Sequence, residues 1–79
     1  MKDTLNIQYF DVHCQFEKSG YSIPVMMAGY RMQTDKSVIE HCINEKLFEQ
    51  EGDEEFVDYV TEIEKDEYRQ MKNIWKTNT

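Results

Sequence analysis

Apolar and polar positions alternate along two runs in the first 33 residues, a pattern typical of half-buried strands. In residues 4–17 the apolar positions are first odd-numbered and then even-numbered. Residues 21–33 show the same change of phase in mirror order. Between the two runs lies KSGY, which contains the turn signal Ser19-Gly20. The pattern predicts an antiparallel β-hairpin.

The register of this hairpin follows from the length of its turn. A two-residue turn at Ser19-Gly20 would place Val12 opposite Met27 and Tyr9 opposite Tyr30. In that register both apolar stripes and both changes of phase are aligned. A side chain changes face only where the register changes or a bulge intervenes.

The change of phase leaves two interpretations. One is a bulge near Asp11 and Gly29, and the other is a hairpin with apolar side chains on both faces. Pro24 has no amide hydrogen to give to a neighbouring strand, so the second strand of the hairpin is expected at a sheet edge. The second interpretation leaves four side chains for another element or a second copy of the chain to cover: Ile7, Tyr9, Tyr30 and Met32.

The next segment, TDKSVIEHCINEKLFEQ, has apolar side chains at helical spacing. Thr34 or Asp35 can cap its start, and Ser37 with Glu40 matches a capping box. Gly52 is expected to end it. The apolar stripe comprises Val38, Ile39, Cys42, Ile43 and Leu47.

Residues 56–75 allow two readings. In the first, FVDYVTEI is a third strand and a short helix follows, with Tyr68, Met71 and Trp75 on one face. In the second, one long helix runs from Asp53. We favour the strand followed by the helix, because Asp66 and Glu67 would interrupt the apolar stripe of the long helix.

These elements predict an α+β fold with the order ββαβα. We expect a small antiparallel sheet that carries the helices on one face. The alternative is a β-hairpin plus two helices, of which the second is long. At this length the chain forms a single small domain over residues 1–79. Residues 76–79 are expected to be a frayed tail.

The net charge of −7 and the pI of about 4.7 change the picture of partners. Such a chain is expected to avoid nucleic-acid backbones and anionic membranes and to attract basic protein surfaces. It has no apolar stretch of about 18 residues, and MKDTLNIQYF lacks the apolar core of a signal peptide. We therefore expect a cytoplasmic protein with reduced thiols.

Candidate chemistry is sparse. Two histidine–cysteine dipeptides, at residues 13–14 and 41–42, raise the possibility of zinc, but neighbouring residues on a strand point to opposite faces. Cys14 and Cys42 lie within apolar stripes and are expected in the core, with His13 and His41 facing water. The acids do not fit a calcium-binding loop, and no catalytic motif is present. We expect no metal, no cofactor and no enzymatic activity.

One run of acids stands out. Ten of the 16 acidic residues lie between residues 49 and 67, where Lys65 is the only base. On a strand, Asp58, Glu62 and Glu64 would share one face. Patches that bind proteins combine charge with aromatic anchors, and aromatic residues are interleaved here. The candidate partner-binding residues are Glu49, Glu51, Asp53, Glu54, Glu55, Phe56, Asp58, Tyr59, Glu62, Glu64, Asp66 and Glu67.

The run EQEGDEEFVDYVTEIEKDE, together with the overall size, resembles the small acidic phage-encoded inhibitors of host defence, such as anti-CRISPR and anti-restriction proteins. This resemblance implies a nucleic-acid mimic that binds the basic groove of a nucleic-acid-handling enzyme in the cytoplasm of a bacterial host. It implies no direct contact with nucleic acid.

Two functions follow as hypotheses. The first is a non-catalytic inhibitor whose acidic face occupies the basic nucleic-acid-binding groove of a partner enzyme. The alternative is a small homodimeric structural or assembly module, in which Ile7, Tyr9, Tyr30 and Met32 form the interface.

Overall fold

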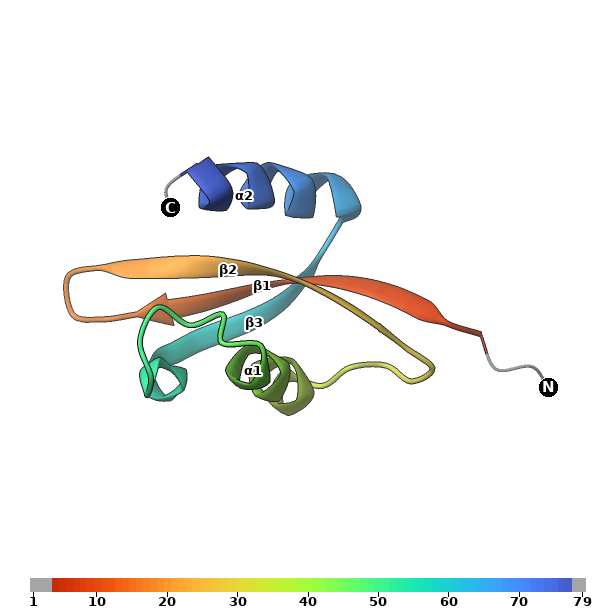
Figure 1. Ribbon diagram of the computed structural model, residues 1–79, viewed down its shortest axis with the longest axis horizontal. Coiled ribbons are helices and arrows are strands. Elements are labelled where there is room, and N and C mark those ends of the chain that lie inside the picture. Colours follow the sequence, from red (N-terminus) through yellow and green to blue (C-terminus); the bar gives the residue numbers. More distant parts are fainter. Residues whose placement is uncertain (1–3, 78–79) are drawn as a thin grey trace.

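The computed structural model describes residues 4–77 of the chain (Figure 1). In chain order the elements are β1 (Asn6–Gln15), β2 (Gly20–Gly29), α1 (Asp35–Asn44), the short 3₁₀ helix η1 (Asp53–Phe56), β3 (Val57–Ile63) and α2 (Lys65–Thr77). The α+β class and the order ββαβα are confirmed, and so is a strand followed by a short helix in the last third. Of the tail expected at residues 76–79, the last two residues lie outside the described part.

The three strands form one antiparallel sheet in the order β2-β1-β3, with β1 in the centre. The expectation that Pro24 marks an edge strand is confirmed, since β2 has a neighbour on one side only. The expectation that both helices cover one face is wrong. Figure 1 shows α2 on one side of the sheet and α1 on the other.

The hairpin register differs from the expected one by four residues. β1 ends at Gln15 and β2 begins at Gly20, so Val12 lies opposite Ile23 instead of Met27. The longer connection is held by the side chain of Gln15, whose Nε2 donates to the carbonyl oxygens of Phe16 at 2.8 Å and Ser19 at 3.1 Å. Because four is an even number, every side chain keeps the face that the alternation predicted.

The main core lies between the sheet and α1. Even-numbered residues of β1 and odd-numbered residues of β2 point to this side, and β3 adds Val57 and Val60 at the margin. The buried cluster consists of Phe10, Val12, Ile23, Val25, Val38 and Cys42.

The other face of the hairpin is also partly apolar, and α2 covers the part of it around Tyr9. The ring of Tyr68 on α2 packs 5.0 Å from that of Tyr9 on β1. Met71 and Trp75 lie on the same helical face as Tyr68 and are half-buried, as expected. The β1–β2 ladder is continuous, so the change of phase reflects a two-faced hairpin and not a bulge. Asp11, on the same face, keeps one buried carboxylate oxygen without a hydrogen-bond partner among the described residues.

Helix α1 begins and ends differently from its prediction. Thr34 is the N-cap, and its capping-box partner is Ser37 instead of the expected pair of Ser37 with Glu40. The helix ends at Asn44, well before Gly52, because Lys46 takes a left-handed backbone with φ of 57°. The amide of Leu47 then donates to the carbonyl oxygen of Cys42 at 2.9 Å, a Schellman-type end that turns the chain back toward the sheet.

Asp53 fastens the segment between α1 and β3 to the hairpin. Its side chain is only 8% exposed, and its Oδ2 accepts from the hydroxyl of Tyr21 on β2 at 2.7 Å and from the amide of Gln50 at 3.3 Å. The Tyr21 oxygen in turn accepts from the amide of Glu49 at 3.0 Å. Burial, and then the hydrogen bond to Asp53, raises the pKa of Tyr21, so the phenol remains a donor.

The burial of the two thiols has a measurable effect on stability at alkaline pH. Cys14 and Cys42 are fully buried, which confirms their expected place. Burial raises the pKa of Cys42 to about 11 from an ordinary 9.0, so as pH rises the unfolded chain loses this proton first. The free energy of unfolding should be unaffected by this thiol below pH 9 and fall as pH rises from 9 toward about 11. Urea unfolding of the protein across this range measures the fall.

Cys42→Ala removes the thiol to which this alkaline fall in the free energy of unfolding is assigned. It should flatten the alkaline fall and should cost about 1 kcal/mol or somewhat more at neutral pH through lost apolar burial. In the native state neither thiol should react with a thiol reagent, whereas both should react in urea. Rapid labelling of either thiol in the native protein contradicts this placement.

Tyr21→Phe tests the Asp53 anchor. The change removes a donor from a buried carboxylate and an acceptor from the Glu49 amide, so it should lower the free energy of unfolding by roughly 1.5–3 kcal/mol. Tyr68→Phe is the control, because the one hydrogen bond of the Tyr68 hydroxyl to a described residue is accepted from the Lys72 ammonium, at 3.4 Å. Its cost should stay within about 0.5 kcal/mol. Equal costs for the two variants in urea unfolding would show that the Tyr21 hydroxyl has no anchoring role.

Candidate interaction surface

Strand β3 is the least covered part of the sheet. None of its residues is buried, in contrast to β1 and β2. Both helices make their more extensive contacts with β2, and α2 also contacts β1. Within residues 4–77 the outer edge of β3 has no neighbouring strand, so its backbone hydrogen-bonding groups on that side are open.

The carboxylates of residues 49–67 follow this open edge, from the segment before η1, along β3, to the first turn of α2. Lys65 remains the only base in this stretch. Eight of the ten carboxylates belong to exposed residues, and that of Glu54 to a half-buried one. We call these nine the acid surface: Glu49, Glu51, Glu54, Glu55, Asp58, Glu62, Glu64, Asp66 and Glu67.

Asp53 is the exception. Its carboxylate is buried against Tyr21, so it serves the fold and does not belong to the exposed surface on which it was expected. Nothing in the sequence separates it from the other acids of the run. Its role depends on Tyr21, which is 32 positions away in the chain.

The acids of β3 do not form the single row that alternation predicts. The β1–β3 register shifts between His13 and Cys14, which places Asp58 in a bulge. Glu62 lies opposite Phe10 and so points to the α1 side, whereas Glu64 follows the end of the strand. The negative charge is therefore spread around the edge of the sheet and is not aligned along one face.

Two aromatic side chains of the candidate set flank the acid surface and are about half exposed. Phe56 is 49% exposed and its ring lies 5.0 Å from that of Phe16. Tyr59 is 43% exposed and stacks on His13 with ring centroids 5.0 Å apart. The negative charge of Asp11, followed by burial, raises the pKa of Tyr59, which keeps its hydroxyl protonated. Each ring has support on one side and solvent on the other, as an interface anchor requires.

The four residues expected at a dimer face are not equivalent. Ile7, Tyr30 and Met32 are 55%, 66% and 69% exposed, whereas Tyr9 is half-buried under Tyr68. Ile7 precedes the part of β1 that pairs with β3, and Tyr30 directly follows β2. These residues therefore lie toward the N-terminal end of the hairpin, away from the η1 end of the acid surface (Figure 1). We call the exposed three the apolar patch.

The histidines and cysteines remain separate. His13 and Cys14 point to opposite faces of β1, as expected. His13 does not simply face water. Its Nδ1 lies 2.9 Å from the hydroxyl of Ser22 and its Nε2 lies 3.0 Å from Oε1 of Gln15, so both ring nitrogens have partners. Among the described residues no group of three or more histidine, cysteine or acidic side chains is placed to hold a metal ion.

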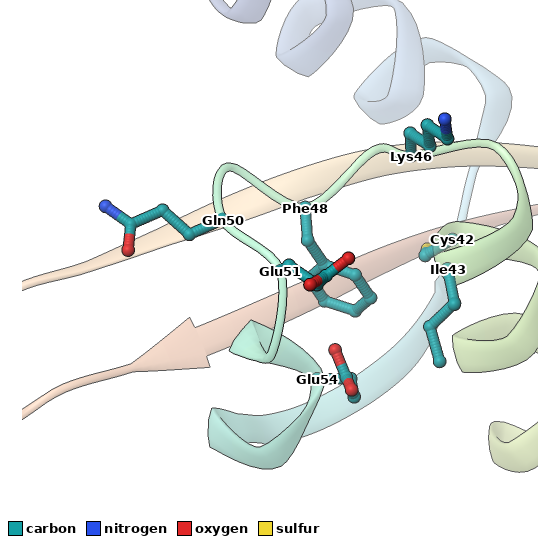
Figure 2. Close-up of a pocket in the computed structure, with 7 residues that line it drawn as sticks. All are labelled: Cys42, Ile43, Lys46, Phe48, Gln50, Glu51 and Glu54. Carbon is teal, nitrogen blue, oxygen red and sulfur yellow. The ribbon is translucent and has the colours of Figure 1, made fainter.

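One feature of the surface, a cavity, is not indicated by any pattern in the sequence. A cavity of about 310 Å³ lies between the end of α1 and the segment that leads to η1. Cys42, Ile43 and Phe48 form its apolar lining, and the acid surface contributes Glu51 and Glu54. Figure 2 shows the carboxylate of Glu51 in front of the Phe48 ring and that of Glu54 below it, with the ammonium of Lys46 pointing away from both. The cavity exists because α1 ends at Asn44, earlier than its pattern predicts.

Residues 4–77 contain no helix of the length and apolar character needed to cross a membrane. No protein-family model, curated protein or solved structure matches the chain.

Proposed function

We propose that this chain is a non-catalytic binding protein that inhibits a nucleic-acid-handling enzyme by occupying its basic groove with the acid surface. The observation that carries the proposal is the position of nine solvent-accessible carboxylates on β3, the least covered strand of the sheet, and on the segments directly before and after it, with Lys65 as the only base of residues 49–67. A basic groove that binds nucleic acid is complementary to this surface in charge. The resemblance to small acidic phage inhibitors implies the same role.

Dense negative charge lowers the stability of a small domain through self-repulsion. Part of the acid surface lies on β3, which has no buried residue to offset that cost. An arrangement that costs stability without serving the core is best explained by a partner that neutralises it.

In the complex, carboxylates would take the places of phosphates on lysine and arginine side chains. Phe56 and Tyr59, each supported on one side by another ring, would supply apolar contacts within the charged surface. The bulge at Asp58 distributes the charges around the edge of the sheet. This distribution fits a groove that surrounds its ligand better than it fits a flat partner surface. Charge attraction speeds association and weakens as salt is added.

Charge reversal tests this function. Glu55, Asp58 and Glu62 are exposed, so replacing each with lysine should leave the fold unchanged. The immobilised protein should capture nucleic-acid-binding proteins from a bacterial lysate, and double-stranded DNA or RNA should compete for them. The triple variant should lose this capture at physiological ionic strength, because like charges would then face one another.

The control variant carries the same change in net charge elsewhere. Glu17, Glu40 and Glu45 are exposed and lie outside the acid surface, and their replacement by lysine should preserve most of the capture. If both triple variants lose the partner equally, net charge alone is responsible. If neither loses it, the acid surface is a solvated surface without a binding role.

A second candidate function rests on the apolar patch. Three large apolar side chains that are more than half exposed, all toward the end of the hairpin where β1 begins and β2 ends, are typical of an interface. A homodimer through this patch would make the chain a small structural or assembly module. Because the patch lies away from the η1 end of the acid surface, a dimer would still present acids to a partner.

Sedimentation at several protein concentrations tests the dimer. The wild-type protein should associate as its concentration rises, and Ile7→Glu together with Met32→Glu should make it monomeric by burying charge at the interface. Ile74→Glu is the control, since Ile74 is 63% exposed on α2 and outside the patch. A wild-type protein that stays monomeric at the highest concentration removes this function.

A further inference from the structure

The cavity beside α1 has a chemistry that is more specific than negative charge. Its interior is apolar, with Phe48 half-buried, Ile43 43% exposed and Cys42 fully buried. The carboxylates of Glu51 and Glu54 also line the cavity, together with the Phe48 ring (Figure 2). An aromatic ring combined with two carboxylates suits a cation that is flat and has several hydrogen-bond donors.

The segment that carries these carboxylates is held in place before any ligand arrives. Asp53, between Glu51 and Glu54, is tied to Tyr21, and its amide donates to the carbonyl of Gln50 at 3.1 Å. Gly52 takes a left-handed backbone with φ of 98°, which sets the turn between the two glutamates. A site whose parts are already positioned loses less entropy on binding than one that must be ordered.

The size of the cavity limits what can enter it. At about 310 Å³ it is at the lower end of the range of small-ligand sites, about 300–1,000 Å³, so it accepts one long side chain and not a nucleotide or a helix. The aliphatic stem of such a side chain would lie against Ile43, with its charged end at the glutamates. Lys46 points away and does not compete for them (Figure 2).

We propose that this cavity is an arginine-binding subsite that receives one arginine side chain of the partner protein. The guanidinium stacks on the Phe48 ring and donates hydrogen bonds to the carboxylates of Glu51 and Glu54. This inference rests on the proposed function, because it names the side chain by which the basic partner is held. A guanidinium is planar, has five donors and stacks on aromatic rings, whereas the ammonium of lysine is a compact charge with three donors.

The subsite can be tested without the partner. The probe is N-acetyl-arginine methylamide, titrated into the ¹⁵N-labelled full-length protein while amide chemical shifts are recorded. Saturable shifts should be confined to the amides around the cavity, at Ile43, Phe48, Glu51 and Glu54, with a dissociation constant on the order of millimolar. The citrulline analogue, which is nearly the same shape but neutral, and the lysine analogue should each bind at least about fivefold more weakly.

The matched variants separate the subsite from general attraction of cations. Glu51→Gln with Glu54→Gln keeps the shape of both side chains and should weaken arginine binding at least about fivefold. Glu64→Gln with Asp66→Asn makes the same change in net charge at exposed positions outside the cavity and should leave binding within about twofold.

Three results overturn the proposal: equal binding of arginine and citrulline analogues, equal binding of the lysine analogue, or equal weakening by both pairs of variants. Each of these can occur while the acid surface still captures its partner, in which case only the subsite is refuted. Conversely, if arginine binds in the cavity but reversal of Glu55, Asp58 and Glu62 does not affect capture, the subsite stands and the proposed function fails.

Discussion

The alternation of side chains along β1 is the constraint on which the rest of the structure depends. Within residues 4–77, β1 is the only strand with neighbours on both sides, so the sheet is assembled around it. Its even-numbered residues, such as Phe10 and Val12, are buried on the side of α1. Its odd-numbered residue Tyr9 packs under α2. One strand thus determines on which side each helix lies, and β3 is added to it with no helix of its own.

The local pattern of apolar residues is sufficient to predict the helices and strands and the residues of the core. Alternation and helical spacing identified both strands of the hairpin, α1, β3 and α2, and placed Cys14 and Cys42 in the interior. These features depend on neighbours within a few positions along the chain. The same alternation also indicates the two-sided arrangement, because apolar residues on both faces of the hairpin need to be covered on both faces. The prediction of both helices on one face conflicts with this requirement.

The features that the sequence did not reveal depend on contacts between distant residues or on backbone geometry. The hairpin register is set by Gln15, whose amide bonds to two carbonyl oxygens of the turn. Asp53 looks like its acidic neighbours, and only its contact with Tyr21 removes it from the surface. The cavity exists because Lys46 adopts a left-handed backbone, a conformation that glycine or asparagine would have signalled more clearly.

The acid surface is joined to the hairpin through a few polar contacts. Asp53 lies within the acidic run and yet belongs to the interior, so the same segment supplies both an anchor and the surface that the anchor positions. The segment from Glu49 to Phe56 is thereby held against the hairpin by hydrogen bonds more than by apolar burial. The negative charge is consequently carried by a loop with a defined shape, which distinguishes it from a flexible acidic tail.

The open edge of β3 has a further consequence for the behaviour of many copies of the chain at once. An uncovered strand is a template on which other strands can assemble into aggregates. Here the bulge at Asp58 interrupts the straight edge, and the carboxylates of two approaching copies would repel one another. The acid surface thus also opposes the pairing of identical chains along this edge of the sheet.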